Sequence, residues 1–335
     1  MSRIKSLDAL RGIAIVAVII LHSVQPQDCP AMGWAFQILN QVCRFAVPCF
    51  FLTAGFFFRH AWRQKPDHLM LARSYARRLL KPFLFWALFY AVVPPFLGGS
   101  PDGIGPAILG HLGNIARHPR SFLLTGFTYH LWFLSSLLQA AGIVWLSLRL
   151  GDIRIALLVG SVFYGVALLS GPYSPTQLGF HTHFDMRNGP FVSTLFFAIG
   201  AWLQERRLNV PLVAGASLMG MGLTMHLAEG LFLFHAFARP LFSNEYLLGT
   251  LPYAVGIMLM ALARPDFEWG LAGRIGLYSL GLYVFHPYVI EVLLRLPFGH
   301  TLSRNPLLFS PLVLAITYAI IRPLGRVARL RSLVL

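Results

Sequence analysis

Residues 7–22 read LDALRGIAIVAVIILH, an apolar stretch that carries three ionisable side chains, Asp8, Arg11 and His22. With its flanks the stretch is long enough to cross a bilayer, which takes about 20 mostly apolar residues. At about 100° per residue, the step from Arg11 to His22 is three turns plus roughly 20°, so both share one face. Asp8 falls near that face, and the polar stripe is about 16 Å long. Such a stripe is hard to reconcile with lipid contact and predicts a membrane helix that faces a bundle interior.

The composition of the whole chain agrees with this stretch. Of its 335 residues 56% are hydrophobic and 12% are charged, and the mean hydropathy is +0.65. A soluble domain carries about a quarter charged residues, so a water-soluble globule is excluded. The net charge of +15 does not indicate a nucleic-acid partner, because the basic residues stand between long apolar runs. The three cysteines fit no zinc spacing and imply no disulfide framework.

The apolar runs predict an all-α fold. We expect a polytopic membrane protein in which about ten transmembrane helices form one membrane-embedded domain over residues 1–335. A shorter apolar piece at 121–127 is placed at the membrane interface. The expected spans are 8–25, 34–58, 80–97, 129–149, 153–170, 190–204, 210–228, 246–263, 275–294 and 307–322.

The distribution of basic residues sets the expected orientation. With the N-terminus inside, most of the 27 Lys and Arg side chains fall on the cytoplasmic side, which is a strong positive-inside bias. We therefore expect a multi-pass protein of a bacterial inner membrane with both termini in the cytoplasm. The outer loops at 94–118 and 172–190 are rich in Pro, Gly and His, where an acceptor from outside could approach.

His22 has two interpretations at this point. An imidazole can take a proton from a hydroxyl near neutral pH, so His22 is a candidate general base. It can equally be a buried histidine whose ring is satisfied by a carbonyl. For Arg11, a structural ion pair with Asp8 is the simpler interpretation. Arg44, ahead of Pro48 in the second span, faces either a cavity at a kink or a neutralising partner in the bundle.

Residues 73–82 read RSYARRLLKP and concentrate cationic side chains before the third span. Arg77, Arg78 and Lys81 could hold the phosphates of a nucleotide-like donor. The alternative is a positive-inside anchor that binds anionic membrane lipids.

The later spans carry fewer candidates. His130 and Trp132 open the fourth span, where an aromatic residue at the interface is ordinary. Ser279, Tyr283 and His286 follow spacings of four and three and share a face, so His286 is either a functional group or an interhelical hydrogen-bond partner. No metal is expected, since His181, His183 and Asp185 stand in a loop without a fourth ligand.

Taken together, these motifs resemble the acyltransferase-3 family of membrane acyltransferases, in particular its surface-polysaccharide O-acetyltransferase branch. The most specific match is Arg11 and His22, separated by ten residues. The resemblance continues through residues 47–56 (VPCFFLTAGF), 77–78, 129–132 (YHLW) and 279–286. Ala54 and Lys81 depart from the family pattern, which often has Ser and Arg at these positions.

The resemblance implies an activity and a set of site residues. It makes His22 the catalytic base, with Arg11 and Asp8 beside it. It also implies that acetyl-CoA, or another acyl-CoA, is the donor. Arg77, Arg78 and Lys81 are expected to bind that donor, with Arg44 and Trp132 as further contacts.

The expected acceptor is a sugar hydroxyl of a surface polysaccharide or a lipid-linked glycan. Tyr283 and His286 are expected on the acceptor side. Membrane lipids are further partners, and self-association into a homo-oligomer is left open. The alternative function is a transporter or flippase of a glycan precursor, because buried charges and kinked helices suit it as well. It predicts inverted repeats, and the polar stripe of the first helix is not mirrored in the second half.

Overall fold

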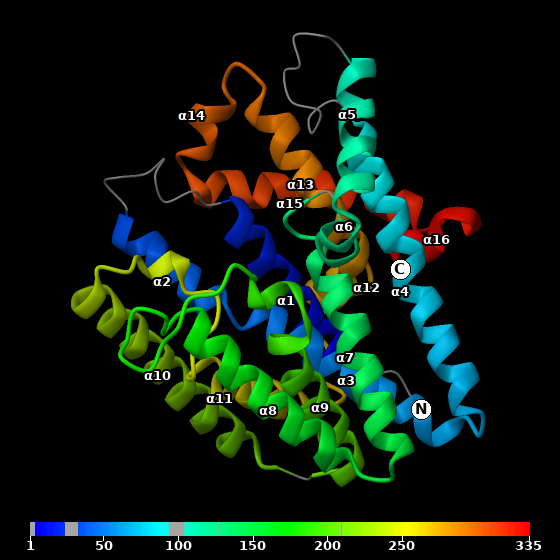
Figure 1. The fold of residues 1–335 in the computed structure, drawn as a ribbon, viewed down its shortest axis with the longest axis vertical. Coiled ribbons are helices and arrows are strands. Elements are labelled where there is room, and N and C mark those ends of the chain that lie inside the picture. Colours follow the sequence, from blue (N-terminus) through cyan, green and yellow to red (C-terminus); the bar gives the residue numbers. More distant parts are fainter. Residues whose placement is uncertain (1–3, 24–32, 94–103, 127, 209) are drawn as a thin grey trace.

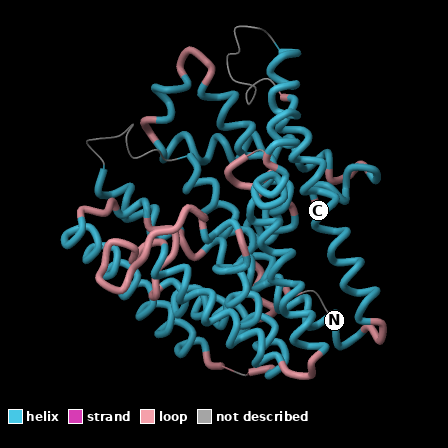
Figure 2. The backbone as a smooth tube through the Cα atoms, in the orientation of Figure 1, coloured by secondary structure: helices cyan, strands magenta, loops and turns pink. Residues whose placement is uncertain are grey.

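The computed structural model describes residues 4–23, 33–93, 104–126, 128–208 and 210–335. Throughout these ranges the regular elements are helices, without any strand (Figure 2), which confirms the all-α prediction. In chain order they are α1 (Lys5–Ser23), α2 (Gly33–Cys43), α3 (Ala46–Gln64), α4 (His68–Val92), α5 (Ile104–Arg117), α6 (Pro119–Thr125), α7 (Trp132–Arg149), α8 (Ile153–Ser170), η4 (Met186–Asn188), α9 (Pro190–Arg206), α10 (Leu212–Phe237), η5 (Leu241–Ser243), α11 (Thr250–Ala263), α12 (Gly270–Leu277), α13 (Ser279–Leu294), α14 (Gly299–Ser303), α15 (Pro306–Leu324) and α16 (Ala328–Val334).

Within the described residues, each of the ten predicted spans lies largely on a helix or on a pair of consecutive helices, whereas residues 24–25 and 94–97 of the first and third spans lie outside the described residues. Within the described ranges, five stretches are long and apolar enough to cross a membrane, and the bent pair α12–α13 makes a sixth. The five are α1, α2–α3 taken together, α8, α10 and α15. The protein is therefore a membrane protein with several apolar helices, but the predicted count of about ten is not confirmed.

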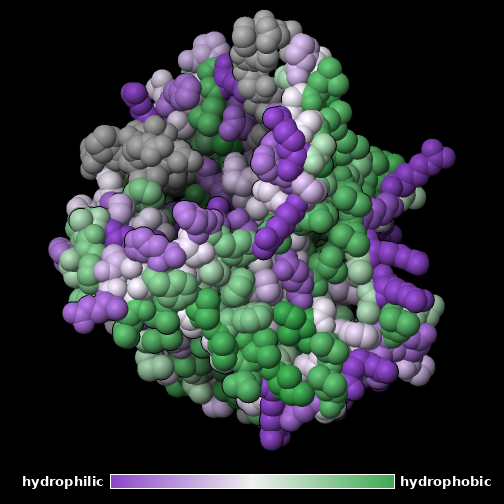
Figure 3. All heavy atoms as spheres, viewed as in Figure 1, coloured by the Kyte–Doolittle hydropathy of each residue, from purple (hydrophilic) through white to green (hydrophobic). Residues whose placement is uncertain are grey.

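The outer faces of α8 and α10 show where lipid would lie. Leu158 and Val162 on α8 are 69% and 57% exposed, and Val213 and Met221 on α10 are 74% and 60% exposed. Figure 3 shows hydrophobic side chains covering a broad area over the lower part of the molecule. An apolar area of this size on the outside is typical of contact with the acyl chains of a bilayer.

The predicted span at 34–58 is two helices. α2 ends at Cys43, and Arg44 and Phe45 form a turn before α3 begins at Ala46. Pro48 lies in the first turn of α3, where its missing N–H would have no helical partner anyway. The break at Arg44 and Phe45 lies four and three residues before Pro48, where the proline ring meets the carbonyl of residue i−4, so the interruption falls where a kink caused by Pro48 is expected. Arg44 extends from this turn.

The predicted span at 275–294 is also broken. α12 and α13 meet at Tyr278 with a bend of 79°. Backbone contact holds α12 against α1: a Cβ atom added to Gly276 would stand 1.9 Å from the Asp8 carbonyl oxygen, and one added to Gly12 would stand 1.9 Å from the Ala272 carbonyl oxygen. These two glycines allow α1 and α12 to touch and place the start of α13 beside Arg11.

The long helix α4 runs along the edge of the molecule, with α16 beside it (Figure 1). Asp67 caps its beginning, because the carboxylate accepts a hydrogen bond from the Met70 backbone N–H at 2.8 Å. Further along, the Trp86 indole N–H donates to the Leu333 carbonyl oxygen at 3.0 Å. The basic residues of 73–81 thus belong to the part of α4 between its cap and this contact with α16.

The helices α3 and α9 cross through a second pair of glycines. A Cβ atom added to Gly55 would stand 1.9 Å from the Phe197 carbonyl oxygen, and one added to Gly200 would stand 1.9 Å from the Leu52 carbonyl oxygen. Both partner atoms are backbone, so no side chain can turn away to make room. Gly55 and Gly200 therefore allow the backbones of α3 and α9 to touch.

Substituting Gly55 by Ala is expected to destabilise the protein by at least about 2 kcal/mol, because α3 and α9 must separate to admit the methyl group. Gly142→Ala is the matched control. Gly142 lies inside α7, and a Cβ atom there has no neighbour within 4 Å. Thermal unfolding of the two purified variants in the same detergent measures the difference. Equal melting temperatures would contradict the backbone contact at Gly55.

Candidate active site

A cavity of roughly 1200 Å³ lies between α4 and the remaining helices. Its walls come from α1, α3, α4, α7, α13 and the C-terminal helix α16. Six cationic side chains line it, against a single carboxylate among the described lining residues, Asp67. The six are Arg11, Arg73, Arg77, Arg78, Lys81 and Arg331. Such an excess of positive charge favours a ligand with several negative charges.

The cationic groups are arranged from the surface inward. Arg77, Arg78 and Lys81 are exposed, and the Lys81 ammonium donates to the Ser332 hydroxyl of α16 at 2.6 Å. Arg11 lies deeper, with 29% of its side chain exposed. The predicted donor-binding residues Arg77, Arg78 and Lys81 thus meet Arg11 in one cavity, although they come from helices far apart in the sequence.

Arg11 is held by two neighbours. Its Nη2 group donates to the buried Ser279 hydroxyl at 2.9 Å, and Nη1 lies 3.8 Å from the Asp8 carboxylate. The ion pair with Asp8 is the structural pairing expected from their spacing. Ser279 is the first residue of α13, so this hydrogen bond joins α1 to the helix after the bend.

His22 lies in the last turn of α1, eleven residues and about 16 Å from Arg11. It is half-buried, and its ring centroid is 5.1 Å from that of Tyr129 and 5.3 Å from that of His286. His130 joins the group, with its ring centroid 5.9 Å from that of His286. Three imidazoles from α1, α13 and the turn before α7 therefore converge.

The buried imidazoles of His130 and His286 have ring nitrogens without a hydrogen-bond partner among the described residues. His286 uses Nδ1 on the Leu282 carbonyl oxygen at 3.0 Å, while its Nε2 is buried without a hydrogen-bond partner among the described residues. Neither ring nitrogen of His130 has such a partner within those ranges. Buried polar atoms are normally paired, so unpaired nitrogens beside His22 indicate a place where a polar ligand belongs.

Tyr283 lies between the cavity and the imidazoles. It lines the cavity, and its hydroxyl donates to the His130 carbonyl oxygen. The face of α13 predicted from the spacing of Ser279, Tyr283 and His286 therefore leads from Arg11, past the cavity wall, to His22.

Arg44 and Trp132 do not line this cavity. Arg44 is held by neutral groups: its Nε donates to the Asn40 side-chain oxygen at 3.0 Å and its Nη2 to the Phe242 carbonyl oxygen at 2.6 Å. Trp132 lies under the guanidinium group of Arg187, which is 6.0 Å from the centre of the indole ring. Both residues belong to a second polar group, described next.

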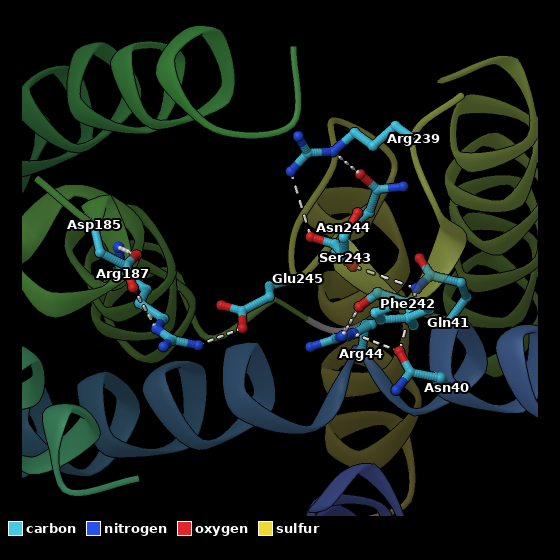
Figure 4. A network of polar contacts seen from close by, with 10 residues as sticks. All are labelled: Asn40, Gln41, Arg44, Asp185, Arg187, Arg239, Phe242, Ser243, Asn244 and Glu245. Carbon is cyan, nitrogen blue, oxygen red and sulfur yellow. Dashed lines mark hydrogen bonds and ion pairs between the residues drawn. The ribbon is translucent and has the colours of Figure 1, made fainter. Parts of the chain in front are cut away.

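This second polar group gathers side chains from loops that are distant in the sequence (Figure 4). Arg187 of η4 pairs with Glu245, and its Nε lies 2.8 Å from the Asp185 carboxylate. Arg239 donates from Nε to the Asn244 side-chain oxygen at 2.8 Å. His22 is within electrostatic reach of Arg44 and Arg187. Sequence reasoning missed Arg187 and Glu245, and the only signal for Arg187 is its place just before the span at 190–204.

The charges in the η4 loop respond to burial and to each other. Burial raises the pKa of the Asp185 carboxyl above its ordinary value, although Arg187 acts in the opposite direction. Burial also acts to lower the pKa of Arg187, but the carboxylates of Glu245 and Asp185 outweigh it, so that pKa is raised. Arg187 is therefore a fixed cation.

Comparison with known proteins gives a family match over nearly the whole chain. The profile described as "Acyltransferase domain", of the acyltransferase-3 family, matches residues 4–324. The chain is also similar to a serine/alanine racemase of Enterococcus gallinarum, with 24% identity over 95% of this chain and 45% of the relative. An amino-acid racemase of Enterococcus faecalis is 23% identical over 59% of this chain and 28% of the relative.

The chain spans less than half the length of these two curated relatives, and the racemase names describe those longer proteins. No solved structure matches the chain. The family profile covers far more than half of the chain and includes all three of Asp8, Arg11 and His22. This chain belongs to the acyltransferase-3 family of membrane acyltransferases.

Proposed function

We propose that the protein is a membrane O-acyltransferase that moves an acyl group, acetyl in the first instance, from a coenzyme A thioester to a sugar hydroxyl. The acceptor in this proposal is a surface polysaccharide or a lipid-linked glycan. The observation that carries the proposal is the cavity itself, which is strongly cationic at the surface and leads inward past Arg11 and Tyr283 towards the imidazoles.

The donor fits the charge of the cavity. Coenzyme A is a polyanion whose phosphates would meet Arg77, Arg78 and Lys81 at the surface, with Arg331 of the neighbouring helix α16 as a further cation. The thioester arm would then pass Arg11, which Asp8 and Ser279 hold in place. Guanidinium groups suit phosphate because they form paired, charge-assisted hydrogen bonds.

His22 supplies the base in this proposal. Its imidazole takes the proton from the acceptor hydroxyl as the oxygen attacks the thioester carbonyl. The new C–O bond forms, the C–S bond breaks, and the coenzyme A thiolate takes back the proton held by His22. His286, with its free Nε2 beside His22, is placed to orient the hydroxyl or a water molecule.

The proposed location is the inner membrane of a bacterium, with both termini in the cytoplasm. Support comes from the excess of Lys and Arg in the stretches assigned to the cytoplasm, among them 59–81 and 322–331. The cationic cavity belongs to this side, where coenzyme A is made and used. The His22 end of α1 then lies towards the outer side, nearer to an extracytoplasmic glycan.

The function is tested by two linked measurements. Mass spectrometry of surface glycan compares cells that lack the protein with cells that regain it, and purified protein in nanodiscs is assayed for thiol release from acetyl-CoA with that glycan. We expect an added acetyl mass in the complemented cells and glycan-dependent thiol release in vitro. Unchanged acylation combined with loss of glycan export would instead favour a transporter or flippase.

A further inference from the structure

The second polar group is distinct from the donor cavity in the residues that form it. None of Trp132, Asp185, Arg187 and Glu245 is among the described residues that line that cavity. They come from the start of α7, from the η4 loop and from the loop before α11. Trp132 follows His130 by two residues. The His130 ring centroid lies 5.9 Å from that of His286, which in turn lies 5.3 Å from that of His22, so the group adjoins the imidazoles.

This group is reachable from outside. The side chains of Asp185 and Glu245 are 46% and 33% exposed, and that of Arg187 is 28% exposed. A ligand could therefore approach the carboxylates without unfolding any described element.

The balance of charge selects the kind of ligand. Three guanidinium groups, Arg44, Arg187 and Arg239, face two carboxylates, Asp185 and Glu245, and Arg187 pairs with both carboxylates. In Figure 4, Glu245 stands between the guanidinium groups of Arg44 and Arg187. The excess of one positive charge attracts an anion far less than the donor cavity with its six cations.

The chemistry of the same set suits hydroxyl groups. Carboxylate oxygens accept hydrogen bonds from hydroxyls, and guanidinium N–H groups donate to them, so the ion pairs need not break. An amino acid, by contrast, would have to displace Arg187 from a carboxylate in order to place its own two charges. Trp132 adds a flat, half-buried aromatic ring, a surface that matches the apolar C–H face of a sugar.

We propose that Trp132, Asp185, Arg187 and Glu245 form the acceptor subsite, which holds an uncharged sugar ring with one hydroxyl directed at His22. This assignment rests on the proposed acyltransferase function and names the acceptor class as a neutral saccharide. Trp132 then serves the acceptor rather than the donor, and Arg44 supports the subsite from the turn after α2 through its bonds to Asn40 and Phe242.

The test uses the full-length protein in nanodiscs and two variants, Glu245→Gln and Trp132→Phe. Binding of glucose, N-acetylglucosamine, glucose 6-phosphate and L-serine is measured by isothermal titration calorimetry. The matched control is Glu205→Gln, since Glu205 also pairs with an arginine, Arg59, at 3.0 Å, but at the far end of α9. Melting temperatures show whether each variant is folded. Trp132→Phe keeps an aromatic ring, so it still tests the subsite if Glu245→Gln does not fold.

We expect the wild type to bind a neutral sugar more tightly than glucose 6-phosphate or L-serine. Both subsite variants should weaken that binding at least tenfold and raise the KM for a saccharide acceptor by a similar factor, with acetyl-CoA affinity unchanged. Glu205→Gln should bind as the wild type does. The subsite is overturned if the wild type binds neither neutral sugar, if a charged probe binds better, or if folded subsite variants bind sugar normally.

The same data separate this proposal from the proposed function. If sugar binding depends on Glu245 and Trp132 but the protein never consumes acetyl-CoA, the proposed acyltransferase function is refuted and the saccharide subsite stands. If the subsite variants bind sugar normally and still consume acetyl-CoA, the acyltransferase function stands and the proposed subsite is refuted.

Discussion

Replacing His22 by Gln is expected to lower kcat for acyl transfer by about 10²–10⁴-fold, the range that a positioned general base contributes. The amide of Gln keeps a polar group of similar reach but cannot hold a proton. Because His22 is not among the described residues that line the donor cavity, the affinity for acetyl-CoA should remain that of the wild type. Single-turnover acyl transfer and equilibrium binding of acetyl-CoA measure the two quantities separately.

The control for this substitution is His300→Gln. His300 is an exposed imidazole on α14, and it should be dispensable for both binding and turnover. Full activity of a folded His22→Gln protein would refute the role of His22 as the base. A defect limited to acetyl-CoA binding would point to a structural role for the α1 terminus instead.

The double substitution of Arg77 and Arg78 by Gln is expected to weaken acetyl-CoA binding about 30-fold or more. A hydrogen bond between charged groups contributes about 1.5–3 kcal/mol, and solvent exposure reduces the contribution of each of these two side chains to about 1 kcal/mol. The loss should shrink as ionic strength rises, because salt already screens the wild-type attraction. Turnover at saturating donor should change little.

Two comparisons sharpen this second prediction. Arg329→Gln removes a charge from α16 at a position that is not among the described residues lining the cavity, and it should leave acetyl-CoA affinity intact. S-acetylpantetheine, which lacks phosphates, should be used equally by the wild type and the double variant. If acetyl-CoA affinity is unchanged but binding to anionic lipid falls, the alternative interpretation of Arg77 and Arg78 as a lipid anchor is correct.

The helices could be located from the sequence because long apolar runs leave few other structures for a chain in a bilayer. The breaks were harder to place. Arg44 and Phe45 interrupt 34–58 three to four residues before Pro48, and the bend at Tyr278 depends on α12 being held against α1 through Gly276. Contacts between distant segments, rather than local propensity, decide the second of these features.

The candidate site also has residues that the sequence predicted and residues that only the fold brings together. Arg11, Arg77 and Tyr283 line one cavity, as their charge and spacing suggested, and His22 meets His286. Roles in binding and catalysis for these residues stay predictions. Arg187 and Glu245 could not be found from the sequence, because charged residues in connecting loops are usually solvated and only the fold brings these two together.

The donor side and the imidazole side are joined by two helices that touch at both ends. On α1, Arg11 bonds to Ser279, and about 16 Å further along His22 meets His286. On α13, Ser279 and His286 are about 10 Å apart along the axis. Together the two helices fix the distance between the Arg11–Ser279 contact and the His22–His286 contact. A single inserted residue in either helix would rotate one imidazole by about 100° and break one of the contacts. Substitutions can therefore change the donor side or the imidazole side separately. Insertions and deletions between Arg11 and His22, or between Ser279 and His286, should not be tolerated.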